Sequence, residues 1–129
     1  MIRILALVLM ISIPSGNRWL VISNGPTVRH IKGTVELYDL PMSEMVVELH
    51  NNPEVILSDK PLEIKQQKIA SVITDQNGKF KFPNVPPGKY ELRVAPDPAT
   101  GINTISIIVR VRRLWFWPLG RGVKVRLSY

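Results

Sequence analysis

The sequence predicts an all-β protein, a seven-stranded antiparallel β-sandwich with Greek-key connections. Two observations predict this fold class: short stretches in which apolar and polar residues alternate, and turn-forming residues between them. Eleven prolines and eight glycines in a chain of 129 residues supply the turns. Alternation places one face of a strand in the core and the other in solvent. Short strands separated by regularly spaced turns are typical of a sandwich.

The first four expected strands follow one another between residues 31 and 82. Residues 31–37 turn Ile, Gly, Val and Leu inward, with Lys, Thr and Glu outward. Residues 45–49 turn Met, Val and Leu inward, which leaves the following His50 on the outward face. Residues 69–74 (IASVIT) are apolar on both faces, so a central strand is expected there. Residues 79–82 alternate outward lysines with inward phenylalanines.

Three more strands complete the predicted sandwich. Residues 90–94 turn Tyr, Leu and Val inward and place Glu91 on the outward face. Residues 105–111 turn Ile, Ile, Val and Val inward, and residues 123–127 do the same with Val, Val and Leu. Continued inward parity would bury Arg113, which is unfavourable without a partner. We therefore expect the sixth strand to end or bulge just before it.

Two turn signals flank the phenylalanine strand. Asp75-Gln76-Asn77-Gly78 predicts a hairpin connection, because Asn77 and Gly78 tolerate positive φ and the Asp75 side chain can accept from the backbone ahead. A calcium loop also uses Asp-x-Asn-Gly but needs further carboxylates, whereas Lys79 and Lys81 follow here. Pro86-Pro87-Gly88-Lys89 predicts a type II turn. Both turns are thus structural, and Phe80, Phe82, Val85, Tyr90 and Leu92 are expected core residues.

These turn and core residues carry a family resemblance. The pattern Thr74-Asp75-x-x-Gly78-x-Phe80-x-Phe82-x-x-Val85-Pro86-Pro87-Gly88-x-Tyr90-x-Leu92-x-Val94 resembles the carboxypeptidase regulatory-like domain. That family belongs with the transthyretin-like (prealbumin-like) and carbohydrate-binding-like sandwiches. The resemblance spans about residues 30–113. It implies an accessory, structural or interaction module, and it implies no reaction.

The N-terminus has the order of a secretory signal peptide. A basic start precedes the apolar run Ile4–Ile13, and small residues follow at Pro14–Gly16. The run is shorter than the roughly 20 residues that span a bilayer. We expect a signal segment over residues 1–23, cleaved at a site between residues 16 and 25, and a domain over residues 28–129. A core strand or helix at the N-terminus, or an uncleaved membrane tether, is the alternative.

Export to the periplasm, cell envelope or extracellular space is therefore the expected localisation. The chain has no cysteine, so it has neither a disulfide framework nor a thiolate metal site.

The C-terminal third predicts a basic surface. The formal net charge is +7, and no acidic residue follows Asp97. Such a surface favours anionic partners: an unknown protein, an anionic membrane or cell-envelope component, or an acidic polysaccharide. Ordinary solubility charge is the alternative, and the export signal argues against nucleic acid. The candidate binding residues are Arg110, Arg112, Arg113, Trp115, Phe116, Trp117, Arg121, Lys124 and Arg126.

The aromatic residues of that set have three competing interpretations. Trp115 and Trp117 could cap the open end of the sandwich. They could instead contact a membrane interface or a partner protein. They could also stack on sugar rings, as fold-level analogy with starch-binding modules suggests.

No residue pattern indicates catalysis, a metal or another cofactor. Both histidines, His30 and His50, fall on outward strand faces, and no phosphate-binding loop occurs. We therefore expect an exported non-catalytic binding or structural module of the cell envelope. The alternative is a carbohydrate-binding module that stacks sugars on Trp115 and Trp117. A small hydrolase would require a pocket that brings His30 or His50 together with an acid.

Overall fold

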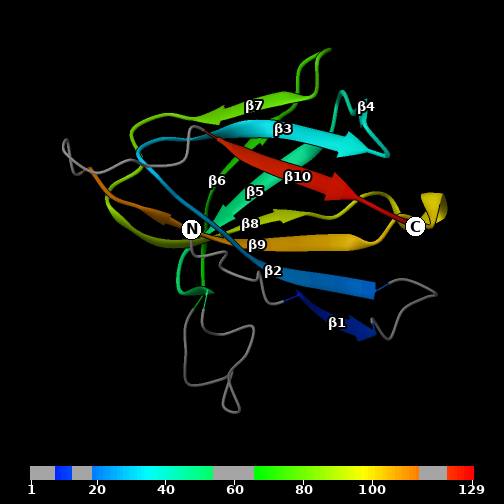
Figure 1. Ribbon diagram of the computed structural model, residues 1–129, viewed down its shortest axis with the longest axis horizontal. Coiled ribbons are helices and arrows are strands. Elements are labelled where there is room, and N and C mark those ends of the chain that lie inside the picture. The colour runs from blue at the N-terminus through cyan, green and yellow to red at the C-terminus, as the bar shows by residue number, and fades with distance from the viewer. Residues whose placement is uncertain (1–7, 13–18, 54–65, 114–121) are drawn as a thin grey trace, which may run out of the picture.

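The computed structural model describes residues 8–12, 19–53, 66–113 and 122–129. Their strands form two sheets, which confirms the predicted all-β sandwich (Figure 1). A short 3₁₀ helix, Pro98–Thr100, lies between two of the strands. Within the described ranges, no helix has both the length and the apolar character needed to span a bilayer.

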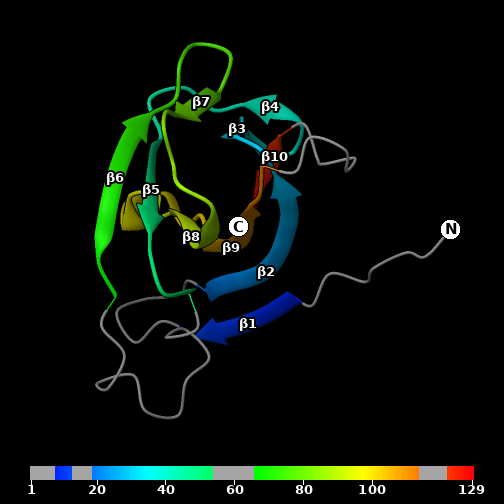
Figure 2. The same cartoon turned by 90° about the vertical axis from the view of Figure 1, so that its left-hand side faces the viewer.

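The large sheet has six strands in the order β1-β2-β9-β8-β5-β6. Their bounds are β1 Val8–Ser12, β2 Trp19–Val28, β9 Thr104–Val111, β8 Gly88–Val94, β5 Val46–His50 and β6 Lys68–Ile73. The small sheet has four strands, in which β3 pairs with β10 and also with β4 and β7. Their bounds are β3 Ile31–Leu37, β4 Leu40–Pro41, β7 Lys79–Phe82 and β10 Val123–Leu127. The turned view in Figure 2 shows β3, β4, β7 and β10 gathered on one side of the molecule.

The described residues contain ten strands, so the expected number of seven is wrong. The seven expected segments correspond to β3 and to β5 through β10, and β4 adds only two residues. The other two additions, β1 and β2, lie where the signal segment was expected. The predicted boundary at residue 23 falls inside β2, so cleavage there would remove the first half of that strand. The signal segment itself stays a prediction.

Two strand pairs are parallel, which corrects the all-antiparallel expectation. β2 pairs with β9 from Leu20↔Thr104 to Val28↔Val111, and β3 pairs with β10 from Gly33↔Val123 to Leu37↔Leu127. The two exceptions share one cause. β2 and β9 end side by side, and after each of them the chain crosses to the small sheet. The strands that follow, β3 and β10, therefore start at the same end and run in the same direction.

Strand β6 lies at an edge of the large sheet, although its apolar sequence predicted a central position. Val72 packs against the core, but Ile69 and Ile73 are 46% and 66% exposed. A run that is apolar on both faces is compatible with a buried central strand, but also with an edge strand that carries apolar residues on its outer face. Periodicity alone does not separate the two.

The core lies between the sheets and contains the expected residues. Phe80, Phe82, Val85, Tyr90 and Leu92 are all buried. The two phenylalanine rings meet edge to face, with centroids 6.2 Å apart. Burying each large apolar side chain contributes about 1.5–3 kcal/mol, so this cluster supplies a large share of the stability.

The Asp75 turn forms as a local structure but is not a hairpin. One carboxylate oxygen of Asp75 accepts from the backbone N–H groups of Asn77 at 2.8 Å and Lys79 at 2.9 Å. Gly78 adopts φ 72°, the left-handed conformation that favours glycine. However, β6 before the turn pairs with β5, and β7 after it pairs with β3. The turn therefore carries the chain from one sheet to the other.

Replacing Asp75 with alanine should lower the free energy of unfolding by about 1 kcal/mol, because two backbone N–H groups lose their acceptor and become solvated. Urea unfolding followed by circular dichroism measures this loss. Gln76→Ala in the same exposed turn is the control and should change stability by less than about 0.5 kcal/mol. Equal losses in the two variants would contradict the role of the carboxylate.

The second turn differs from the expected type II geometry. Gly88 has φ 158° and already begins β8, whereas a type II turn needs about 80° at that position. The chain turns earlier, at Asn84, which has φ 57°. The Tyr90 hydroxyl donates to the Pro86 carbonyl at 2.7 Å and so fixes the segment. Burial raises the pKa of that hydroxyl above 10.0, although the nearby Arg113 charge opposes the shift.

Candidate functional site

The outward face of the large sheet buries polar and charged side chains. Glu91 and Ser106 are each 0% exposed, and His50 is 7% exposed. The sequence pattern placed Glu91 and His50 on this face correctly, but the expectation that they meet solvent is wrong. Each has a hydrogen-bond partner: Ser106 on the neighbouring strand β9 donates to Glu91, and His50 contacts Glu48 on its own strand.

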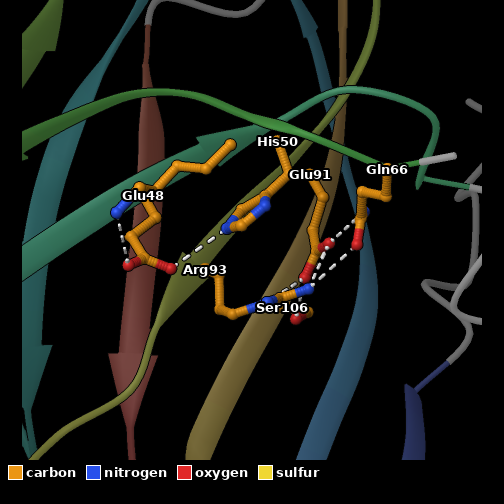
Figure 3. Close-up of polar contacts among 7 residues, drawn as sticks. Glu48, His50, Gln66, Glu91, Arg93 and Ser106 are labelled. Atoms are coloured by element: carbon orange, nitrogen blue, oxygen red, sulfur yellow. Dashed lines mark hydrogen bonds and ion pairs between the residues drawn. The ribbon is translucent and has the colours of Figure 1, made fainter.

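Glu91 is the centre of this buried polar network (Figure 3). It accepts from Arg93 Nε at 2.8 Å and Nη2 at 2.9 Å, and from Gln66 Nε2 at 2.7 Å. The Ser106 hydroxyl on β9 donates to the same carboxylate. Burial raises the pKa of Glu91, but these hydrogen bonds and the Arg93 charge outweigh burial and hold it below 4.5. Glu91 is therefore a buried anion whose hydrogen bonds come from protein groups instead of water. Its bond with Ser106 links β8 to β9.

His50 lies beside an acid, which is the arrangement that a hydrolase would need. Its Nε2 is 3.0 Å from Glu48 Oε1, while Lys68 lies 3.7 Å from the other oxygen of Glu48. The Ser106 hydroxyl donates to Glu91, so its proton is not directed at His50. In the described ranges no three His, Cys, Asp or Glu side chains are grouped so as to hold a metal. The geometry fits two structural contacts: Glu48 with Lys68 joins β5 to β6, and Glu91 with Ser106 joins β8 to β9.

The two ends of the sandwich differ in charge. One end is where β2, β7 and β9 finish and β3, β8 and β10 begin, at the left in Figure 1. The exposed cations at this end include Arg29, Lys89, Arg110, Arg112 and Arg113. We call the surface formed by these five residues the basic end. The loops at the opposite end carry the exposed acids Asp39, Glu44, Asp75 and Asp97. Within the described residues, the loops at the two ends therefore carry opposite charge.

At the basic end, two cations face each other across a strand pair. Lys89 on β8 lies directly opposite Arg110 on β9, and both are exposed. On its other side Arg110 is paired with Thr27 of β2. β2 bulges between Asn24 and Thr27, and a hollow of about 290 Å³ lined by Asn24, Thr27, Lys89 and Arg110 lies beside the bulge. The hollow thus presents two cations together with an amide and a hydroxyl.

The structure separates the basic residues that the sequence grouped together. Arg113 donates to the Val85 carbonyl at 2.7 Å and so helps to hold the segment before β8. Strand β9 ends at Val111, as expected. Lys124 is ion-paired with Glu36 at 3.8 Å on the small sheet. Arg126 lies directly opposite Glu36, nearer the acidic loops.

The remaining members of the predicted binding set lie outside the described residues: Trp115, Phe116, Trp117 and Arg121. Lys89 was not predicted as a member. Its outward parity beside Tyr90 was visible in the sequence, but its position opposite Arg110 depends on the pairing of β8 with β9.

A family model matches the region that builds most of this sandwich. The model is described as the second beta sandwich domain of BOS complex subunit NOMO1-like proteins, and it matches residues 41–113. The chain belongs to this family. The match runs from β4 to just past β9 and leaves β3 and β10 outside it. The NOMO1-like assignment confirms the predicted β-sandwich family at this broader level.

One similar protein is Colossin-A of Dictyostelium discoideum. It is 38% identical to the NOMO1-like chain over 65 residues, which are 50% of this chain and 1% of Colossin-A. The chain therefore spans only about one hundredth of the length of that relative.

Proposed function

We propose that this NOMO1-like domain is a non-catalytic interaction module that binds an acidic surface of a partner protein through its basic end. The observation that carries the proposal is the exposed Lys89–Arg110 pair beside the 290 Å³ hollow. Like charges directly opposite each other in a sheet are destabilising. A carboxylate from a partner would remove that repulsion and accept hydrogen bonds from both side chains.

The charge difference between the ends favours one docking orientation. A partner with an acidic face is attracted to the basic end and repelled by the loops that carry Asp39, Glu44, Asp75 and Asp97. Such complementarity raises association rates and fixes orientation more than it raises affinity. The family is described by a subunit of a complex, which supports a role in protein contacts.

The finer family and the localisation are part of the same proposal. The turn and core residues from Thr74 to Val94 support a domain of the carboxypeptidase regulatory-like type, whose members act as accessory modules. The apolar run Ile4–Ile13 supports export to the periplasm, cell envelope or extracellular space.

Photo-crosslinking tests the proposed contact. A photoreactive amino acid in place of Arg112, in the full chain expressed in its own cells, should give a crosslink to a protein. The joint variant Lys89→Thr and Arg110→Thr should reduce its yield about tenfold, because losing the two cations together weakens the contact by roughly 1.4 kcal/mol.

The control variant Lys68→Thr and Arg126→Thr removes the same formal charge from β6 and β10, outside the residues of the basic end, and should crosslink like the parent. Equal crosslinking by the test and control variants would refute docking through Lys89 and Arg110. Crosslinks to lipid alone would make the membrane the partner and would equally refute a protein contact.

A further inference from the structure

The outward face of the small sheet carries a second pair of facing cations. Lys32 on β3 lies directly opposite Lys81 on β7, and Lys79 lies opposite Thr34 in the same ladder. All three lysines are exposed, and their β7 neighbours Phe80 and Phe82 point into the core. Three lysine side chains therefore project from one face over two adjacent strands.

In the described part of the chain none of these three lysines forms an ion pair. Its ion pairs are His50 and Lys68 with Glu48, Arg93 with Glu91, and Lys124 with Glu36. None of these pairs includes Lys32, Lys79 or Lys81. Asp75 lies beside them, and one of its carboxylate oxygens accepts from two backbone N–H groups. One carboxylate beside three lysines leaves this surface net positive, with the like charges of Lys32 and Lys81 directly opposite each other.

The same lysines line a groove of about 670 Å³. Its volume lies in the range of about 300–1,000 Å³ that is usual for small-molecule sites. Three apolar residues also line the groove: Val72 and Ile73 of β6 and Phe80 of β7. Ile73 is 66% exposed. A groove of this kind suits a ligand that has an anionic group beside an apolar part.

We propose that this groove binds an oxyanion of the phosphate or sulfate type, carried on a molecule with an apolar portion. Lys32 and Lys81 hold the oxyanion between them, and Lys79 supplies a third donor. Ile73 and Val72 contact the apolar portion. The proposal does not rest on docking through the basic end, because it uses other residues on the other sheet.

Titration of the full chain with sodium phosphate at constant ionic strength, followed by amide NMR shifts, tests the site. Shifts should map to β3 and β7 around Lys32 and Lys81. Lys81→Thr should weaken phosphate binding about tenfold, which corresponds to the loss of one charge-assisted contact. The same variant should raise the Tm in the absence of phosphate by about 2 °C, because it removes the facing charge.

Lys68→Thr is the matched control, since it removes one exposed cation at the far end of β6. It should bind phosphate like the parent. Phosphate binding by Lys81→Thr at the parent affinity, a Tm below that of the parent, or shifts confined to Lys89 and Arg110 would overturn the proposal.

Two sources of the oxyanion are separated by a second arm. Vesicles of phosphatidic acid in phosphatidylcholine should retain the parent but not Lys81→Thr if the ligand is a lipid headgroup. If the ligand is a soluble phosphate ester, phenyl phosphate should bind more tightly than inorganic phosphate, and neither protein should sediment with vesicles. If the parent neither binds the vesicles nor binds phenyl phosphate more tightly than inorganic phosphate, the proposed contact between Ile73, Val72 and an apolar portion of the ligand is wrong.

Discussion

Replacing Arg93 with methionine should lower the free energy of unfolding by about 3–5 kcal/mol. The variant keeps an apolar stem but leaves Glu91, which is 0% exposed, without its counter-charge. Removing one partner of a buried ion pair costs this much because the remaining charge stays desolvated. Gln66 and Ser106 still donate to the carboxylate, but neither carries a charge. Urea unfolding at pH 7 measures the loss.

The pH dependence of stability should change with the same substitution. In the parent, the pKa of Glu91 is held below 4.5, so its stabilisation is present above pH 4.5 and is lost as the pH falls through the lower folded value. In Arg93→Met the pKa of Glu91 should rise relative to the parent, because the charge and hydrogen bonds of Arg93 no longer oppose burial. The variant therefore loses less stability than the parent as the pH falls, and the difference between the two proteins should shrink between pH 7 and pH 4.

Two control variants test whether the stability loss in Arg93→Met comes from the unpaired buried charge and not from the change of side chain. Glu91→Gln should cost less, about 1–3 kcal/mol, because Arg93 is partly exposed and can reach water. Lys124→Met breaks the exposed pair with Glu36 and should cost less than about 1 kcal/mol. If Arg93→Met were no more harmful than Lys124→Met at pH 7, the buried network would not contribute to stability as described.

Gly33→Ala should lower the free energy of unfolding by about 3 kcal/mol or more, because added volume in a tightly packed place forces the backbone to move. A Cβ at Gly33 would overlap the backbone carbonyl of Val123 on β10. Gly33 also pairs with Phe80 on β7, so any shift disturbs three strands of the small sheet. Thermal unfolding and amide NMR spectra measure the effect.

Gly122→Ala is the matched control, because its Cβ would lie 3.2 Å from the Lys32 carbonyl and needs only a small adjustment. It should cost less than about 1 kcal/mol. A Gly33→Ala protein as stable as Gly122→Ala would show that β10 does not approach β3 this closely.

Alternation in the sequence predicted seven of the ten described strands and most of the core. Phe80, Phe82 and Leu92 are buried where their parity placed them, because parity follows from local backbone geometry. The burial of Glu91 could not be predicted in this way. It depends on Ser106 from the next strand and on Gln66, and their approach is set by long-range pairing.

For the candidate sites too, local sequence predicted which side chains are exposed, whereas strand pairing decides which of them lie together. The run of arginines after Asp97 predicted a basic surface, but the chain crosses to the other sheet between Arg113 and Lys124. That crossing separates Lys124 and Arg126 from Arg110 and Arg112. Lys32 and Lys81 were expected to face outward, yet only the β3–β7 register shows that they face each other.

The two parallel strand pairs have a consequence for the timing of folding. Gly33 pairs with Val123, and Leu20 pairs with Thr104, so each pair joins the early part of the chain to the late part. Contacts between residues so far apart in sequence close large loops and slow the search for the native state. During synthesis β3 must wait with an open edge until β10 leaves the ribosome. A domain whose two sheets are completed only by β9 and β10 needs protection from aggregation until both strands have been synthesised.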